Sequence, residues 1–182
     1  MLIPEIKIYN LRIVPSQPVF NEVVGFKKRF RDVFGNQPLS KSKPHITLAI
    51  FEMDTRYEDI LIEVFDQLSI IGKFELDIEG FGIFKGESNT LILNVPKTKD
   101  IERLHTQLKI LWSRDLHRKK ALTLSSTPHI TISKTNDTGM LHTSFELFQK
   151  TDYSKRIQIT HLTLVSRYKG KTWDWEHHIA LL

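Results

Sequence analysis

The tetrapeptide Pro-His-Ile-Thr occurs twice in the chain, as Pro44-His45-Ile46-Thr47 and as Pro128-His129-Ile130-Thr131. The two histidines lie 84 residues apart (129 minus 45). When the chain is shifted by this offset, the segments around both copies follow the same order: strand, helix, motif strand, helix and closing strand. The repeated tetrapeptide therefore predicts a duplicated β-α-β-α-β unit.

The apolar periodicity places the two units at about residues 7–84 and 91–168, with a last strand at 173–180. We expect one continuous closing strand in each unit, at 74–84 and at 157–168. Segregated helices and short connections favour antiparallel sheets. The sequence thus predicts a single α+β domain over residues 1–182, whose motif strands face each other across a pseudo-twofold axis.

Each motif presents one imidazole and one hydroxyl on the same side of a strand, because side chains alternate between the two faces. His45 and Thr47 share one face, and His129 and Thr131 do the same. An imidazole near neutral pKa can take or give a proton, and a hydroxyl can donate a hydrogen bond to a phosphate oxygen. Two such units together suit the metal-free cleavage of a phosphodiester, with one histidine as base and the other as acid.

The other histidines have simpler interpretations. A single strand histidine is more often a buried, hydrogen-bonded residue than a catalytic one, but an identical tetrapeptide in matching places of a repeat favours catalysis. A third His-x-Thr, His161-Leu162-Thr163, lacks the proline and falls on a closing strand, so we expect it at most to border the cleft. We expect no metal site, since the adjacent His177 and His178 point to opposite faces of a strand. The remaining histidines are expected on helix surfaces or ends: His105, His117 and His142.

The composition limits the class of protein. There is no cysteine, which excludes disulfides, thiolate metal ligands and a thiol nucleophile. The 26 Lys and Arg against 21 Asp and Glu give a net charge of +5, which favours polyanionic partners. The start of the chain lacks the pattern of a secretory signal, and no apolar run approaches a membrane span. We expect a cytoplasmic protein with no membrane association.

The sequence resembles the two-histidine (2H) phosphoesterases, which include the RNA 2',3'-cyclic phosphodiesterases also called 2'-5' RNA ligases. The resemblance covers nearly the whole chain, and its anchors are His45-Ile46-Thr47-Leu48 and His129-Ile130-Thr131-Ile132. Softer matches are a glycine-aromatic segment at 80–84, the helical segment Leu104-His105-Thr106-Gln107-Leu108, and Ser166-Arg167 with Gly170 and Trp173.

The resemblance implies a bilobal fold with two antiparallel sheets around a central cleft, and catalysis without a metal or other cofactor. It assigns the catalytic roles to His45, Thr47, His129 and Thr131. In many relatives a basic residue follows the second motif, and Lys134 stands there after Ser133. Lysine neutralises a phosphate but lacks the bidentate fork of arginine.

The candidates for substrate binding are of two kinds. Phe51, Phe84 and Trp173 offer rings on which a base can stack, and Phe51 is expected on the same face as His45. The polar and cationic candidates for phosphate contacts are Lys43, Ser133, Lys134, Arg167 and Lys171. The basic stretch 114–120 ends a helix, and we expect its role to be mainly structural.

We therefore expect a monomeric cyclic phosphodiesterase that opens 2',3'-cyclic phosphate ends of RNA, with the reverse 2'-5' ligation possible by microscopic reversibility. One alternative keeps the chemistry and changes the substrate to a small cyclic nucleotide, a cyclic oligonucleotide or a sugar cyclic phosphate. Another is a non-catalytic RNA- or nucleotide-binding module. The resemblance covers several substrates, so fold and substrate are separate questions.

Overall fold

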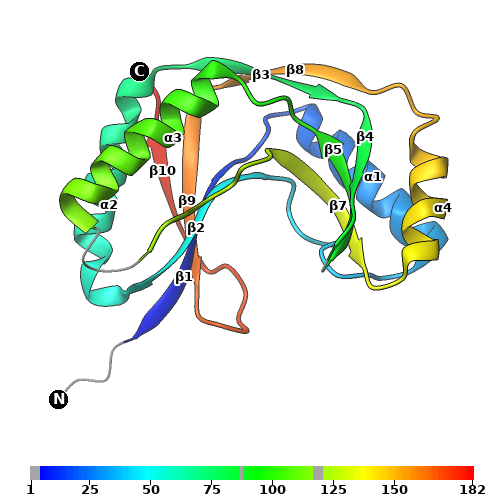
Figure 1. The fold of residues 1–182 in the computed structure, drawn as a ribbon, viewed down its shortest axis with the longest axis horizontal. Coiled ribbons are helices and arrows are strands. Elements are labelled where there is room, and N and C mark those ends of the chain that lie inside the picture. The colour runs from blue at the N-terminus through cyan, green and yellow to red at the C-terminus, as the bar shows by residue number, and fades with distance from the viewer. Residues whose placement is uncertain (1–4, 87, 117–120) are drawn as a thin grey trace.

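The computed structural model describes residues 5–86, 88–116 and 121–182. Its elements follow the predicted order twice along the chain (Figure 1). The first unit contains β1 (Ile6–Ile13), α1 (Val19–Phe34), β2 (Ile46–Asp54), η1 (Thr55–Tyr57), α2 (Glu58–Asp66), η2 (Gln67–Ile71), β3 (Phe74–Glu79) and β4 (Phe81–Phe84). The second contains β5 (Asn89–Asn94), α3 (Lys99–Leu111), the π-helical turn η3 (Trp112–Leu116), β6 (Thr123–Leu124), β7 (His129–Thr135), α4 (Thr138–Phe148), β8 (Ser154–Ile159) and β9 (His161–Arg167), followed by β10 (Trp175–Ala180).

The strands form two antiparallel sheets, which confirms the predicted α+β class. The large sheet has the order β10-β9-β1-β2-β7-β5-β4, with β6 paired to β2, and the small sheet pairs β3 with β8. The two motif strands, β2 and β7, are neighbours at the centre of the large sheet, where Ile46 pairs with Ile130. The pseudo-twofold relation predicted from the repeat is therefore present at the middle of the molecule.

Each closing strand is broken in two, so the prediction of one continuous strand at 74–84 and at 157–168 is wrong. The breaks fall at Gly80, which has a φ of 62°, and at Thr160. A positive φ is open to glycine at little cost. Before each break the chain belongs to the small sheet, and after it the chain joins the large sheet. The small sheet thus connects the two ends of the large one (Figure 1).

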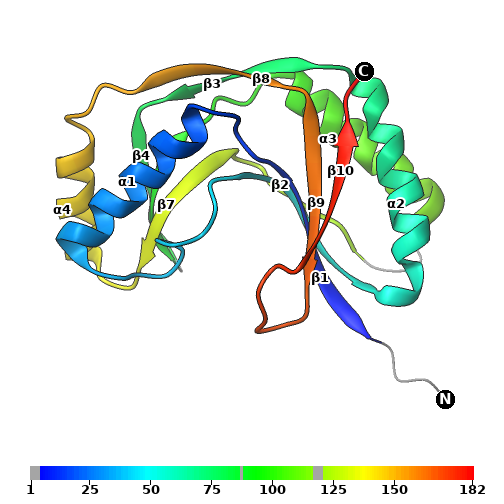
Figure 2. The same cartoon turned by 180° about the vertical axis from the view of Figure 1, so that it is seen from behind.

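The molecule has two lobes, and the first helix of each unit packs on the lobe of the other. The first lobe comprises β10, β9, β1 and β2 with helices α2 and α3, and the second comprises β7, β5 and β4 with α1 and α4 (Figures 1 and 2). This exchange ties the halves together without a linker. Among the described residues, no helix is long and apolar enough to cross a membrane.

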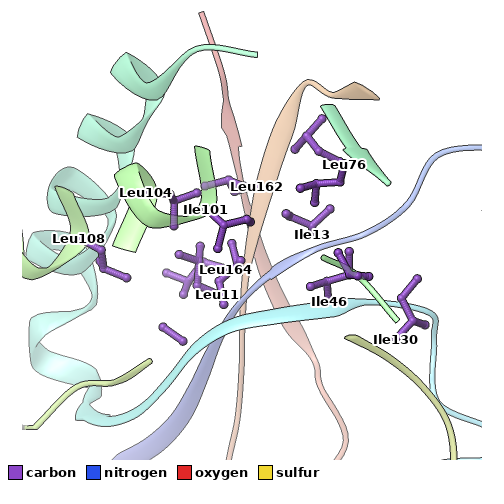
Figure 3. Close-up of a cluster of buried hydrophobic side chains, with 14 of the residues drawn as sticks. Leu11, Ile13, Ile46, Leu76, Ile101, Leu104, Leu108, Ile130, Leu162 and Leu164 are labelled. Atoms are coloured by element: carbon purple, nitrogen blue, oxygen red, sulfur yellow. The ribbon is translucent and has the colours of Figure 1, made fainter. Parts of the chain in front are cut away.

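The core is continuous between the lobes. Ile46 and Ile130 are fully buried beside Ile13, and the leucines of β1 and β9 pack against α3 (Figure 3). Burying an isoleucine or leucine side chain stabilises a fold by roughly 1.5–3 kcal/mol. The apolar residue between His and Thr in each motif therefore anchors that motif to the centre of the core.

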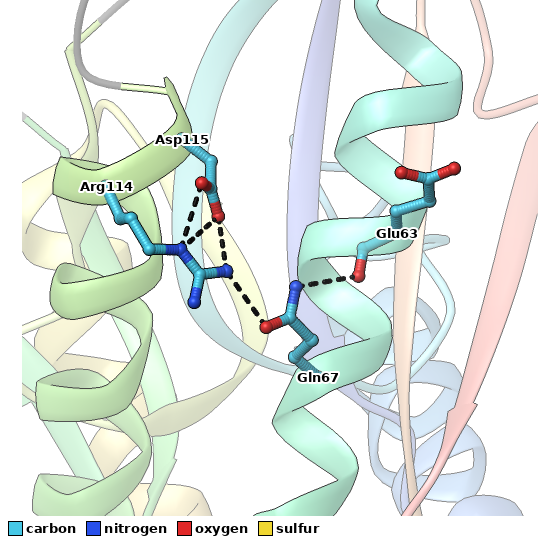
Figure 4. A network of polar contacts seen from close by, with 4 residues as sticks. All are labelled: Glu63, Gln67, Arg114 and Asp115. Atoms are coloured by element: carbon cyan, nitrogen blue, oxygen red, sulfur yellow. Dashed lines mark hydrogen bonds and ion pairs between the residues drawn. The ribbon is translucent and has the colours of Figure 1, made fainter.

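A polar contact joins the end of α3 to α2. Arg114 of η3 pairs with Asp115 and donates a hydrogen bond of 2.9 Å to the Gln67 side chain, whose amide contacts the carbonyl of Glu63 (Figure 4). Arg114 begins the basic stretch 114–120, for which a mainly structural role was predicted, and its contact with Gln67 is structural. Residues 117–120, including His117, lie outside the described residues.

Candidate active site

The two His-x-Thr motifs meet because β2 and β7 are antiparallel neighbours. The pairing of Ile46 with Ile130 sets a register in which residue 45 lies opposite 131 and residue 47 opposite 129. Both isoleucines point into the core, so the histidines and threonines share the other face of the sheet. Each histidine of one motif thus lies across from the threonine of the other, and all four side chains are half-buried.

The two imidazoles are held in the same tautomer by matching hydrogen bonds. Nδ1 of His45 lies 2.8 Å from the carbonyl oxygen of Lys43, and Nδ1 of His129 lies 2.8 Å from that of Thr127. A carbonyl only accepts, so Nδ1 must hold the proton and donate it. In the neutral ring Nε2 is then an unprotonated base, free to exchange a proton with a bound substrate.

Burial lowers the pKa of both histidines, because it disfavours the charged imidazolium. The pKa of His45 falls to about 4, first through burial and then through the positive charge of Arg12. The pKa of His129 is also lowered, by burial and by the charge of Lys134. Both rings are therefore neutral at pH 7 in the free protein.

Each motif is followed by a β-bulge at the equivalent position. In β2 the partners of Leu11 and Arg12 are Ala49 and Thr47, which leaves Leu48 as the extra residue. In β7 the partners of Leu91 and Ile92 are Ser133 and Thr131, which leaves Ile132 as the extra residue. Beyond a bulge the alternation of side chains is reversed.

This reversal corrects two predictions for substrate-binding residues. Phe51 does not share the face of His45: it is 3% exposed and packs in the core against Tyr9, with stacked rings 5.4 Å apart. Ser133 is 2% exposed and lies on the core side of β7, so it is not at the cleft. The same bulge places Lys134 on the face of His129, consistent with its effect on the pKa of that histidine.

A buried side chain from a helix binds the carbonyl of each bulge residue. His105 of α3 lies 3.2 Å from the Leu48 oxygen, so the prediction of a surface role for His105 is wrong. Lys27 of α1 is 2% exposed and donates to the oxygens of Ile132 and Leu39 and to the Ser42 hydroxyl, at 3.0–3.3 Å. Both helices thus fix the geometry just beyond the catalytic motifs.

The bulges also correct the alignment of the two units. Matched by their positions beside the bulges, Leu11 corresponds to Leu91, an offset of 80 (91 minus 11), while Ala49 corresponds to Ser133, an offset of 84 (133 minus 49). The helices α1 and α3 begin at residues 19 and 99, again 80 apart. The second unit is four residues longer from the start of its first helix to its motif histidine (30 against 26), and η3 and β6 lie in this segment.

Two residues of β1 that the sequence interpretation missed connect to the first motif. The Asn10 side-chain amide donates to Thr47 Oγ1 at 3.3 Å, and its oxygen accepts from Arg12 Nε at 3.1 Å. Because Nε can only donate, the orientation of the Asn10 amide is determined. Alternating polar residues inside a strand, here at 10 and 12, were the available signal.

A pocket of about 480 Å³ opens beside His45 in the first lobe. The predicted residues Lys43 and Trp173 line it, together with Arg12, Thr163 and Trp175. Arg167 packs its guanidinium on the Trp173 ring at 4.5 Å. Lys171 is exposed, and its carbonyl accepts from Arg167.

The remaining candidates are Phe84 and the third His-x-Thr. Phe84 packs edge-to-face on the His129 ring, with centroids 4.8 Å apart. Of the third His-x-Thr, Thr163 lines the pocket while His161 contacts the His178 ring, which fits a border position. Within the described ranges, no group of three or more His, Cys, Asp or Glu side chains is arranged to hold a metal ion.

Comparison with known families identifies the chain. The family model of the 2'-5' RNA ligase superfamily matches residues 16–171, and the chain belongs to this superfamily. This confirms the resemblance noted in the sequence. No curated protein matches the sequence.

Solved structures share the fold at low sequence identity. TT0787 of Thermus thermophilus is 15% identical, with a TM-score of 0.65 over 96% of this chain and 95% of that one. E. coli LigT, complexed with 3'-AMP, is 16% identical, with a TM-score of 0.61 over 98% and 97%. Usb1 of Kluyveromyces marxianus is 10% identical, with a TM-score of 0.50 over 96% and 98%. At these identities the likeness establishes the fold.

Proposed function

We propose that the protein is a metal-independent phosphodiesterase that opens 2',3'-cyclic phosphate ends of RNA. The observation on which this rests is the antiparallel register of the motifs, which brings two neutral imidazoles and two hydroxyls onto one face. Such a set serves a reaction in which one proton is removed and another supplied at the same phosphorus. The LigT structure in complex with 3'-AMP supports a nucleoside monophosphate as the kind of product that this fold accommodates.

In the proposed reaction one histidine removes a proton from water through Nε2, and the water oxygen bonds to phosphorus. The bond from phosphorus to one ribose oxygen breaks, and the other histidine, which takes up a proton beside the bound anionic substrate, gives that proton to the oxygen. We assign the base to His45, whose pKa of about 4 keeps it unprotonated, and the acid to His129. Thr47 and Thr131 donate to the non-bridging oxygens as negative charge develops on them.

Asn10 supports the role of Thr47 as a donor. Its amide N–H occupies a lone pair of Thr47 Oγ1, so the hydroxyl proton is available to the substrate. The neighbouring Lys134 supplies positive charge on the side of His129. With a 5'-hydroxyl of RNA in place of water as the nucleophile, the same groups serve ligation in reverse.

The test uses an RNA oligonucleotide that ends in a 2',3'-cyclic phosphate, incubated with the pure protein in EDTA. We expect opening to a single monophosphate isomer, and a loss of at least about 100-fold in rate for both His45→Ala and His129→Ala. The exposed His142→Ala is the matched control and should retain the wild-type rate. Wild-type protein that leaves the RNA intact would refute the substrate assignment. Turnover retained by both site variants would refute the two-histidine mechanism. RNA that is bound but not opened, with the same affinity in both site variants, would point to a binding module instead.

A further inference from the structure

Two arginines lie around a single tryptophan at the edge of the active site. The guanidinium carbon of Arg12 is 4.7 Å from the centroid of Trp173, and that of Arg167 is 4.5 Å from it. Arg12 is 5% exposed and lies on β1, and Arg167 ends β9, the neighbouring strand. Arg12 and Trp173 line the pocket beside His45, and Arg167 packs on the same tryptophan ring without lining that pocket itself.

Neither arginine has a carboxylate partner among the described residues. Arg12 donates through Nε to Asn10, and Arg167 donates through Nη1 to the carbonyl of Lys171. Nη2 of Arg12 and Nε of Arg167 are buried without a partner. Glu176 lines the same pocket and its charge raises the pKa of Arg12, but it makes no ion pair with Arg12 and lies 3.4 Å from His178. A buried charge without an opposite charge is costly to a fold, and two of them repel each other.

The effect of this crowding is visible in the pKa of Arg12. Burial lowers it to about 10, and the charge of Arg167 contributes in the same direction. An anion bound in the pocket at the Arg12 guanidinium would offset both effects. Arginine is the residue best suited to such a ligand, because its planar donors match the oxygens of a phosphate.

The position of Arg12 relative to the two motifs indicates that it binds a phosphate other than the one that reacts. Arg12 lies opposite Thr47, one strand spacing of ~4.8 Å away, and its side chain extends outward to Trp173. His45 lines the pocket. His129 and Thr131 lie on the neighbouring strand β7 and do not line it. A group in this pocket is therefore next to the phosphorus on which both histidines act, and is a different part of the substrate.

We propose that Arg12, assisted by the charge of Arg167 on the same tryptophan, binds a second phosphate of the substrate, on the 5' oxygen of the ribose that bears the cyclic phosphate. This rests on the proposed function and narrows it to substrates with a phosphate on both sides of the terminal ribose, as an RNA chain has. Nucleoside cyclic phosphates with a free 5'-hydroxyl would be poor substrates.

The test compares two small substrates: a nucleoside 2',3'-cyclic phosphate with a 5'-hydroxyl, and the same compound with a 5'-phosphate. We expect wild-type kcat/KM to favour the 5'-phosphate by at least about tenfold, the size of a charge-assisted hydrogen bond. In Arg12→Gln and Arg167→Gln the ratio should fall towards one. Damage to Thr47 through Asn10 would slow both substrates equally and leave the ratio unchanged.

Arg156→Gln is the matched control, since Arg156 is an exposed arginine that pairs with Asp77 on the small sheet. Its ratio should equal that of the wild type. Equal turnover of both substrates by the wild type would overturn the second phosphate site and leave the phosphodiesterase intact. A wild-type protein that opens neither substrate would overturn both proposals. Should Arg12→Gln fail to fold, the wild-type ratio and Arg167→Gln still decide.

Discussion

In the first lobe Thr47 lies beside Arg12 on the neighbouring strand, whereas in the second lobe Thr131 lies beside Ile92. After the bulge the situation is reversed: the first lobe presents the exposed Ile50 where the second presents Lys134. The duplicated fold thus keeps the reacting groups in pairs. The cation beside them differs in position: it is next to the threonine in the first lobe and beyond the bulge in the second. The difference teaches that the motifs determine the chemistry, while the residues around them determine how a substrate lies.

The largest expected effect concerns the two hydroxyls. Thr47→Val and Thr131→Val should each lower kcat by about 10²–10³-fold, because each removes a donor to developing negative charge. Asn10→Leu should lower kcat by a smaller factor, about tenfold, since it acts on the reacting groups through Thr47, while its contact with Arg12 affects substrate binding. Adding Asn10→Leu to Thr47→Val should cause no further loss. A loss that multiplies in this double variant would show that Asn10 acts independently of Thr47.

The next effect compares the two bulges. Lys27→Met should lower the free energy of unfolding by about 3 kcal/mol, because three acceptors lose a buried donor. His105→Phe should cost only about 1 kcal/mol, since the backbone N–H of Ser125 still donates to the Leu48 oxygen. Urea unfolding of both variants measures the difference. Equal losses, or a larger loss for His105→Phe, would contradict the conclusion that Lys27 stabilises its bulge more than His105 does.

A smaller effect sharpens the electrostatic comparison. The charge of Lys134 lowers the pKa of His129, so Lys134→Gln should raise that pKa. A protonated His129 then persists to higher pH, and the alkaline limb of kcat/KM should move upward. The acidic limb, set by His45 near pH 4, should stay in place. The measurement is a pH profile of both proteins, and a shift of the acidic limb instead would reverse the assignment of acid and base.

The smallest effect concerns Ser133, which was predicted to bind substrate and which the structure places away from the cleft. Ser133 faces the core side of β7, so Ser133→Ala should leave KM within about twofold of wild type. Steady-state kinetics on the cyclic phosphate RNA measures this. A several-fold rise in KM with unchanged stability would return Ser133 to the binding site.

The repeated tetrapeptide was enough to predict the order of elements, the antiparallel class and the meeting of the two motif strands at the centre of the molecule. It was not enough to place Phe51 or Ser133, because alternation assumes a regular strand and a bulge leaves no signal in apolar residues such as Leu48 and Ile132. His105 was missed for a related reason, since its partner is the backbone carbonyl of the bulge residue Leu48, which the residue pattern does not reveal. Arg12 was missed because its neighbours in space come from β2 and β9, which are distant from β1 in the sequence.

The most direct test of the central idea, that both motifs act on one phosphorus, is a double-mutant cycle. Single-turnover rates of opening an RNA 2',3'-cyclic phosphate are measured for the wild type, His45→Ala, His129→Ala and the double variant. If the two histidines act as a unit, the double variant should be about as slow as the slower single variant. Losses that multiply, or one single variant at the wild-type rate, would contradict the account.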